Sequence, residues 1–196
     1  MVSLTETEKR ALLILLKDYT NFFNANSLSK ELGISHVGSQ KLLKRLKEQG
    51  ITHTKKIGKS IVHKPDLEND YNQKLASFLL ADEANNYKRW KEEFKELDDN
   101  NRIVMVYGSI IKNYKQANDV DIMVVMDKKD INQVDRILRD IDETMPKKIH
   151  AIKLSEHDLI KNINEKNGVI IDIIRNAVVL YGQDRYVEVL RDVAGF

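Results

Sequence analysis

The residues best suited to chemistry lie in the stretch 105–125, which contains a Gly-Ser pair and two closely spaced aspartates. Gly108 and Ser109 follow a short apolar run, and Asp119 and Asp121 stand one residue apart where a second apolar run begins. Because alternate residues of a strand point the same way, we expect both carboxylates to face one site. Such oxygen ligands suit Mg²⁺, which takes further ligands from water and from substrate phosphates. The alternative is an ordinary turn with two solvated acids at a strand entrance.

The Gly-Ser pair predicts the other half of the same site. At Gly108 the backbone can approach the phosphates of a triphosphate, and Ser109 with the N-terminus of a following helix can hold their oxygens. The pair therefore predicts a phosphate-binding turn beside the two carboxylates.

These residues need a frame of short strands and helices, and the apolar pattern after residue 100 predicts one. Pro146 ends one of the helices, and Ser155 with Asp158 forms a capping pair at the start of another. We expect strands at 103–107, 120–126 and 148–154, and helices at 110–114, 131–145, 155–164, 169–180 and 186–193.

The order strand, Gly-Ser, helix and Asp-x-Asp on the next strand resembles the DNA polymerase β-type nucleotidyltransferase superfamily. The minimal nucleotidyltransferases of prokaryotes are the most similar members, over about residues 85–185, and AVVLYG at 177–182 is similar to the end of that small domain. The resemblance implies transfer of a nucleotidyl group from an NTP to a hydroxyl on a protein, a nucleic acid or a small molecule. It implies Asp119 and Asp121 as catalytic and metal-binding residues, and Gly108, Ser109 and Lys112 as nucleotide-binding residues.

The chain departs from this family pattern in three places. Lys112 stands where the minimal family usually has arginine, so the charge remains but the planar fork is lost. The loop to Asp119 is slightly shorter than usual. The superfamily's third carboxylate, a metal ligand and general base, is missing from the strand KKIHAIKL, where His150 is nearest to the expected place. We interpret His150 as structural or as the mark of a degenerate site, with a substitute base as the alternative. Asp172 lies after the expected strand and is left without a role.

Composition and charge limit the classes of protein. The chain has 196 residues, 42% hydrophobic and 32% charged, and no cysteine, which excludes disulfides and thiolate metal sites. The absence of a long apolar run predicts a cytoplasmic protein without a membrane partner. Residues 1–65 hold twelve Lys/Arg and five Asp/Glu, a charge of +7, whereas residues 66–196 hold twenty and twenty-five, a charge of −5. This asymmetry favours two units with different partners, the first a binder of a polyanion.

The basic front predicts three helices, with Ser27 as N-cap of the second and Ser35 as N-cap of the third, and then a hairpin turning at Gly58. The predicted helices span 5–19, 27–32 and 35–49, and the order resembles the winged helix-turn-helix family over residues 5–64. The resemblance implies DNA as partner, with the third helix in the major groove. Protein interaction is the alternative role of such a module. The implied base contacts are Ser35, His36, Ser39 and Gln40, and the implied phosphate contacts are Lys41, Lys44, Arg45, Lys55, Lys56 and Lys59.

The segment 66–99 contains no Gly or Pro and predicts one long helix or two shorter ones. Its stripe of Tyr87, Trp90, Phe94 and Leu97 should pack on the following domain, with a dimer or ligand contact as the alternative. The predicted fold class is α+β: a winged helix-turn-helix at 1–65, a connecting helical segment at 66–99, and a nucleotidyltransferase-like small mixed sheet with flanking helices at 100–196.

Three functions follow as hypotheses. The first is an Mg²⁺-dependent nucleotidyltransferase. The second is a DNA-binding transcriptional regulator whose degenerate second domain binds only nucleotide or metal. The third is a toxin–antitoxin-like protein with a small helical protein partner. A homodimer is compatible with each of them.

Overall fold

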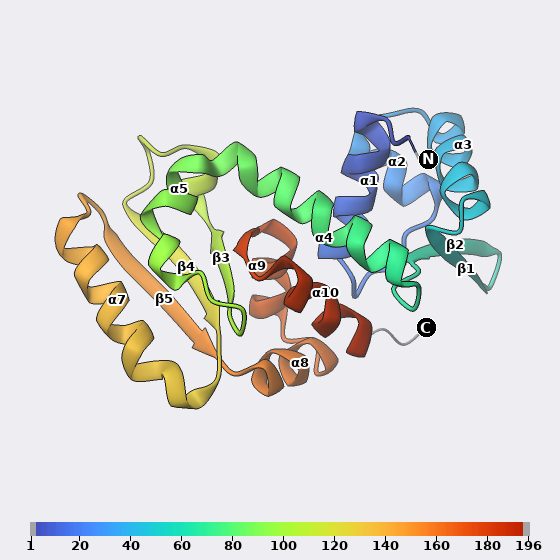
Figure 1. Ribbon diagram of the computed structural model, residues 1–196. Helices are drawn as coiled ribbons and strands as arrows, with labels where there is room; N and C mark the ends of the chain where they lie inside the picture. The colour runs from blue at the N-terminus through green and yellow to red at the C-terminus, as the bar shows by residue number, and fades with distance from the viewer. Residues whose placement is uncertain (1–2, 194–196) are drawn as a thin grey trace.

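The computed structural model describes residues 3–193 and shows two parts joined by a long helix (Figure 1). The first part consists of α1 (Glu6–Lys17), α2 (Ala25–Leu32) and α3 (His36–Glu48), followed by the antiparallel hairpin of β1 (Thr52–Ile57) and β2 (Ser60–Pro65). The hairpin turns at Gly58, whose φ is +57°. The predicted three helices and hairpin are confirmed.

Side-chain caps set the beginnings of these helices. Thr5 and Glu8 form the expected capping box at α1, and the Ser35 side chain caps α3. The prediction for α2 was wrong: Asn24 is its N-cap, and Ser27 is the reciprocating third residue of the helix. The Asn24 side chain accepts from the backbone N–H groups of Asn26 and Ser27, both at 2.9 Å. The helix therefore begins earlier than expected because asparagine caps as well as serine does.

The connecting segment contains α4 (Asp70–Ala84), a 3₁₀ turn η1 (Asn85–Tyr87), α5 (Lys88–Glu93) and a second 3₁₀ turn η2 (Lys95–Leu97). Trp90, Phe94 and Leu97 are buried against sheet residues such as Val104, which confirms that the stripe packs on the following part. Tyr87 is half-buried at the edge of the same cluster.

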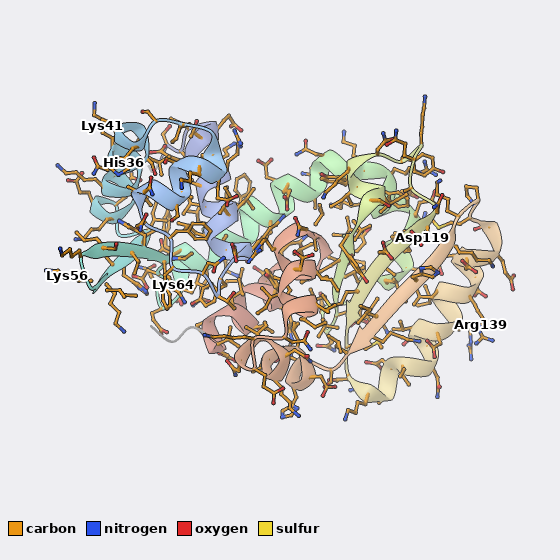
Figure 2. All side chains as sticks on the ribbon, turned by 180° about the vertical axis from the view of Figure 1, so that it is seen from behind. His36, Lys41, Lys56, Lys64, Asp119 and Arg139 are labelled. Carbon is orange, nitrogen blue, oxygen red and sulfur yellow. The ribbon has the colours of Figure 1, made fainter. Side chains whose placement is uncertain are left out.

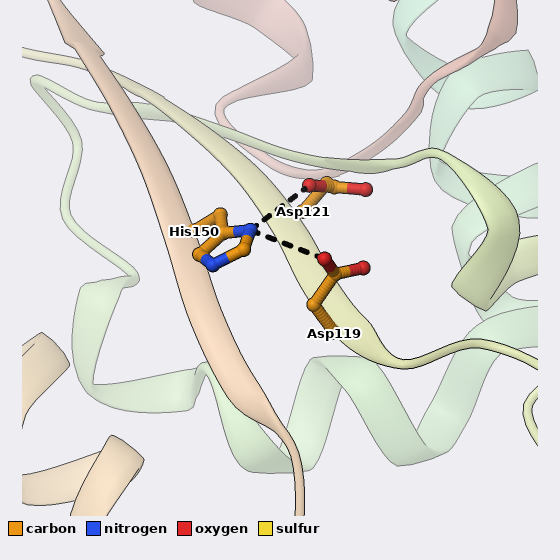
Figure 3. A group of neighbouring side chains, drawn as sticks. All are labelled: Asp119, Asp121 and His150. Atoms are coloured by element: carbon orange, nitrogen blue, oxygen red, sulfur yellow. Dashed lines mark ion pairs between the residues drawn. The ribbon is translucent and has the colours of Figure 1, made fainter.

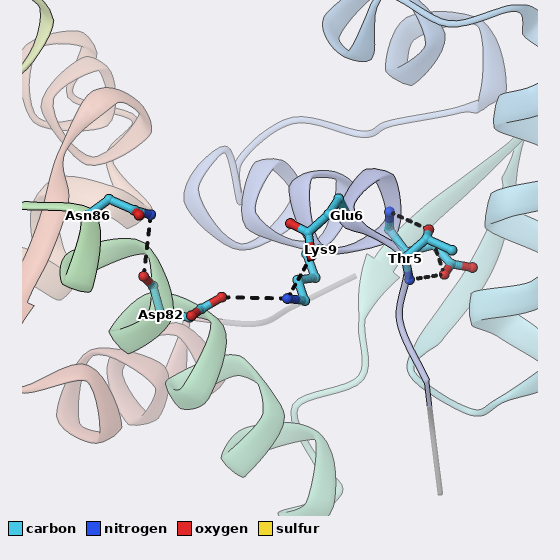
Figure 4. A network of polar contacts seen from close by, with 6 residues as sticks. Thr5, Glu6, Lys9, Asp82 and Asn86 are labelled. Atoms are coloured by element: carbon cyan, nitrogen blue, oxygen red, sulfur yellow. Dashed lines mark hydrogen bonds and ion pairs between the residues drawn. The ribbon is translucent and has the colours of Figure 1, made fainter.

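The long helix α4 contributes to every apolar cluster of the molecule. Leu79 belongs to the core of the helices and hairpin, Ala76 and Leu80 belong to a core shared by both parts, and Ala84 belongs to the core under α5. An ion pair also links α1 to α4: Lys9, which lies 2.9 Å from Glu6 of its own helix, lies 3.7 Å from Asp82 of α4 (Figure 4).

A four-stranded mixed sheet forms the second part, in the order β5-β4-β3-β6. β3 runs antiparallel to β4 and β6, whereas β4 and β5 are parallel. The elements after α5 are β3 (Ile103–Tyr107), α6 (Ser109–Lys112), β4 (Asp119–Val125), a 3₁₀ turn η3 (Lys128–Asp130), α7 (Ile131–Thr144), β5 (Lys148–Leu154), α8 (Glu156–Asn164), α9 (Gly168–Asn176), β6 (Val178–Tyr181) and α10 (Gln183–Asp192).

One predicted helix, 169–180, was wrong in its last four residues. Helix α9 ends at Asn176, and the chain then becomes extended at Ala177 and pairs with β3 as strand β6. A continuous apolar run has no period of its own, so its pattern does not separate a buried helix from a buried strand.

Helices cover both faces of the sheet. Met105, Met123 and Val179 face the core shared with α1, α4 and α8–α10, and Val104 and Val124 face the core under α5 and α7. In Figure 1, α7 lies outside β5, while α9 and α10 lie between the sheet and the N-terminal helices. Within residues 3–193, no helix combines the length and apolar character needed to cross a membrane.

Candidate metal and nucleotide site

The turn after β3 brings the backbone of Gly108 against a carboxylate. Gly108 has φ +79° and ψ −156°, a conformation that side-chain-bearing residues rarely adopt. A Cβ added at this position would lie 2.3 Å from Oδ2 of Asp121. Glycine is therefore required here both by the backbone and by the close approach of Asp121.

Asp119 and Asp121 stand at the start of β4 and point to the same face of the sheet. Asp121 is paired with Tyr107 across the antiparallel β3 and with His150 across the parallel β5. Nδ1 of His150 lies 3.2 Å from Oδ2 of Asp119 and 4.0 Å from Oδ1 of Asp121 (Figure 3). One possible ligand atom from each of the three residues lies within 4.8 Å of the others.

The electrostatics of the pair favour a bound cation. Burial raises the pKa of Asp121, the neighbouring Asp119 carboxylate raises it further, and His150 opposes both effects. Burial and the Asp121 carboxylate also raise the pKa of Tyr107. Within residues 3–193, His150 is the only basic side chain forming an ion pair with either carboxylate. Two half-buried carboxylates of like charge fit a divalent cation, which would relieve their repulsion.

Side-chain contacts fix the loop between α6 and β4, which leads to Asp119. Tyr114 in the loop between α6 and β4 accepts a hydrogen bond of 2.9 Å from Arg89 of α5, whose guanidinium lies 3.9 Å from the Tyr114 ring centre. On the same ring, the Lys147 amine lies 5.0 Å from the centre, and it also donates to the carbonyl of Ala117. The loop is thus held from α5 and from the start of β5.

A cleft of about 590 Å³ opens beside the carboxylates, between the Gly108 turn and α9. Lys112 lines this cleft, and Ser109 is exposed at the start of α6. Asp172 also lines the cleft, but its Oδ1 accepts from Asn176 at 3.2 Å and it is not part of the group around His150. The residues that line the cleft are Tyr107, Gly108, Lys112, Ile152, Gly168, Val169, Asp172, Ile173 and Asn176.

Sequence reasoning missed the contribution of α9 to this cleft. Gly168, Ile173 and Asn176 line it, although nothing in their types marks them as functional. The one signal was Asp172, an acid inside an apolar run.

The predicted DNA-contacting residues lie at the opposite end of the molecule from Asp119, as the labelled His36, Lys41 and Lys56 show (Figure 2). The side chains of Ser35, His36, Gln40, Lys41, Lys44, Lys55, Lys56 and Lys59 are exposed. A groove of about 470 Å³ runs between α3 and the hairpin and is lined by residues that include His36, Gln40, Lys44, Lys47 and Lys59.

Two of the predicted contacts need correction. Ser39 is fully buried, because it lies three, four and seven residues before the buried leucines of α3, so it does not reach a surface. Arg45 is half-exposed and turned toward α1, where it lies 3.3 Å from Glu8 and donates to the Ser3 carbonyl at 2.6 Å. We therefore leave both residues out of the proposed DNA surface.

The sheet order, the glycine turn and the paired aspartates together define a domain of the nucleotidyltransferase type. The family model described as Polymerase beta, Nucleotidyltransferase matches residues 89–186, and the chain belongs to this family. The match begins within α5, so the helix that carries Arg89 and Trp90 is part of the family domain. Comparisons with curated proteins and with solved structures found no match.

Proposed function

We propose that the family domain binds an NTP with a divalent cation at the Gly108 turn and transfers its nucleotidyl group to a hydroxyl acceptor. The observation that carries this proposal is that Asp121, grouped with Asp119, lies directly against the backbone of Gly108, and that Gly108 in turn lines the cleft. A structural ion pair would not require a glycine against a carboxylate, nor a cleft beside it.

Each residue of the proposed site has a role that follows from its position. Asp119 and Asp121 hold the cation, which when bound supplies charge neutralisation at the phosphates. The Gly108 backbone lets the triphosphate approach, and Lys112, at the end of α6, offers a point charge to its oxygens. The hydrophobic wall of the cleft includes Ile152 and Ile173, against which a nucleoside can pack.

The reaction balances without a buried base. The acceptor oxygen bonds to the α-phosphorus while the bond from that phosphorus to the bridging oxygen breaks, so pyrophosphate leaves. The proton of the acceptor passes to water, since the site is open: 64% of the His150 side chain is exposed. Solvent access replaces the general base that the family places on this strand.

The test is transfer of label from α-³²P-labelled NTPs to the protein itself or to added acceptors, with Mg²⁺ and with Mn²⁺. We expect labelling by the full chain and none by Asp121→Asn, while Asp172→Asn retains it. Nucleotide binding without transfer would favour the regulator with a degenerate domain. If the chain neither binds nor transfers any NTP, the proposal is wrong.

DNA binding by the N-terminal part is the second candidate function. The specific observation is the groove between α3 and the hairpin, where Lys44, Lys47 and Lys59 meet Gln40 and His36. A winged helix-turn-helix would use α3 as recognition helix and the hairpin as wing. Lysines lie on both elements, and residues 1–65 carry a net charge of +7, whereas residues 66–196 carry −5.

Salt dependence tests this second function. We expect Lys44→Ala and Lys59→Ala each to lower the slope of log affinity against log salt by about one, as the loss of one phosphate contact does. Lys74→Ala, in the exposed surface of α4, is the matched control. If the three variants bind DNA alike, the groove is not a DNA surface.

A further inference from the structure

The place of the missing third carboxylate is filled by an imidazole in ligand geometry. β4 and β5 run in parallel register, so His150 lies beside Asp121 and points to the same face. Two ligands in neighbouring positions of an octahedral ion, each about 2.1 Å from it, lie about 3.0 Å apart. The 3.2 Å from Nδ1 of His150 to Oδ2 of Asp119 is close to that spacing.

The lysine of β5 aligned with Asp119 pairs with a different carboxylate. Lys148 is opposite Asp119 in the parallel register. Its amine lies 3.1 Å from Oδ2 of Asp142 on α7, and the other oxygen of Asp142 accepts from the Ile149 backbone at 2.8 Å. Among the described residues, the basic group paired with Asp119 and Asp121 is therefore His150.

Ligand chemistry then decides between ions. Mg²⁺ prefers oxygen ligands, whereas imidazole is a good ligand for first-row transition metals. A histidine in place of a carboxylate also gives the site one negative charge fewer, and two hard cations would need that charge.

Resting on the metal-dependent function proposed above, we propose that Asp119, Asp121 and His150 bind a single first-row transition-metal ion, such as Mn²⁺ or Co²⁺, in preference to Mg²⁺. The family reaction at this site therefore depends on that class of ion. His150 acts as a ligand, and not as a base.

Titration calorimetry of the full chain without nucleotide tests the preference. We expect Mn²⁺ and Co²⁺ to bind at least about 10-fold more tightly than Mg²⁺. His150→Ala should lower the Mn²⁺ affinity at least about 10-fold, and His150→Asp should raise the Mg²⁺ affinity. His157→Ala, which alters an exposed histidine of α8, is the control and should change neither.

Pulsed electron paramagnetic resonance gives a second readout. Mn²⁺ bound to the wild-type chain should show coupling to an imidazole nitrogen, which His150→Ala removes and His157→Ala leaves. Equal or tighter binding of Mg²⁺, absence of nitrogen coupling, or absence of bound ion overturns the inference. The proposed function is tested apart from it, because NTP transfer that runs best with Mg²⁺ would sustain the function and refute the ion preference.

Discussion

Substituting Gly108 by alanine should damage the site far more than the fold. The new Cβ would lie 2.3 Å from Oδ2 of Asp121, whereas Cβ contacts below 3.0 Å essentially do not occur, so the carboxylate must move by about 0.7 Å or more. Metal–oxygen distances tolerate only about 0.2 Å. Asp121 would therefore leave the position from which it is proposed to bind the metal ion.

The two consequences differ in size. The backbone conformation of Gly108, φ +79° and ψ −156°, costs an alanine about 1–3 kcal/mol of folding free energy. The displaced ligand should lower Mn²⁺ affinity by about 10- to 100-fold, the range seen when groups that orient ligands are lost. Urea unfolding measures the first effect, and titration calorimetry with Mn²⁺ measures the second.

Two other glycines separate strain from contact. Gly50 has φ +68° and nothing within 4 Å of an added Cβ, so Gly50→Ala should lose similar stability and keep its metal affinity. Gly182 has φ +76°, and its Cβ would lie 2.0 Å from the Arg102 carbonyl oxygen, so Gly182→Ala should lose more stability than either. The reasoning is refuted if Gly108→Ala binds Mn²⁺ like the wild type, or if Gly50→Ala weakens binding equally.

Three further predictions concern stability, measured by urea denaturation. Burial, with a smaller effect from a nearby lysine, lowers the pKa of His63 from 6.5 to about 4. The folded state keeps this ring neutral while the unfolded chain takes up a proton, so its contribution is complete above pH 6.5 and about 3 kcal/mol is lost by pH 4. His63→Gln should remove this part of the pH dependence and His36→Gln should not; an unchanged slope in the first variant would contradict the assignment. Arg175→Ala should lower the free energy of unfolding by about 2 kcal/mol, because it leaves the buried Asp18 carboxylate, 2.9 Å away, without its charged partner. Adding Asp18→Asn should recover part of this loss. If the losses of the two single variants simply add in the double variant, the ion pair does not contribute. Phe94→Ala should cost about 3–5 kcal/mol, because this ring is fully buried between α5 and the sheet; a loss below about 1 kcal/mol would mean that α5 adds little to the domain.

Elements bounded by turn or cap residues could be predicted closely from the sequence. The strand from Ile103 to Tyr107 has its predicted limits, because Gly108 forces the chain to turn. The strand from Lys148 to Leu154 is likewise as predicted, since Pro146 and the Ser155 cap bound it. No glycine, proline or capping residue marks the boundary at Ala177. The predicted helix was therefore extended into residues that form strand β6.

The burial of Ser39 was available from the sequence but was overlooked. Its spacing to Leu42, Leu43 and Leu46 is that of one helix face, and the three leucines form the core. Val37, an apolar residue of the same helix, is 57% exposed. Serine is usually found at the surface, but the position of Ser39 on the leucine face of α3 buries it.

Half of the candidate site could be predicted and half could not. The spacing of Asp119 and Asp121 on one strand is a local property, so their shared face followed from alternation. Their meeting with His150 depends on the parallel register of two strands, and the closing wall of the cleft depends on how α9 docks. Those are long-range contacts, for which a single sequence carries no spacing rule.

The position of α4 has a consequence for how the chain unfolds. Leu79 and Leu80 are neighbours in one helix, yet they are buried in different cores, and Ala84 is buried in a third. Melting this one helix would open all three cores together, so thermal unfolding should be a single cooperative transition. Proteolytic cleavage within α4 should therefore release no stably folded half.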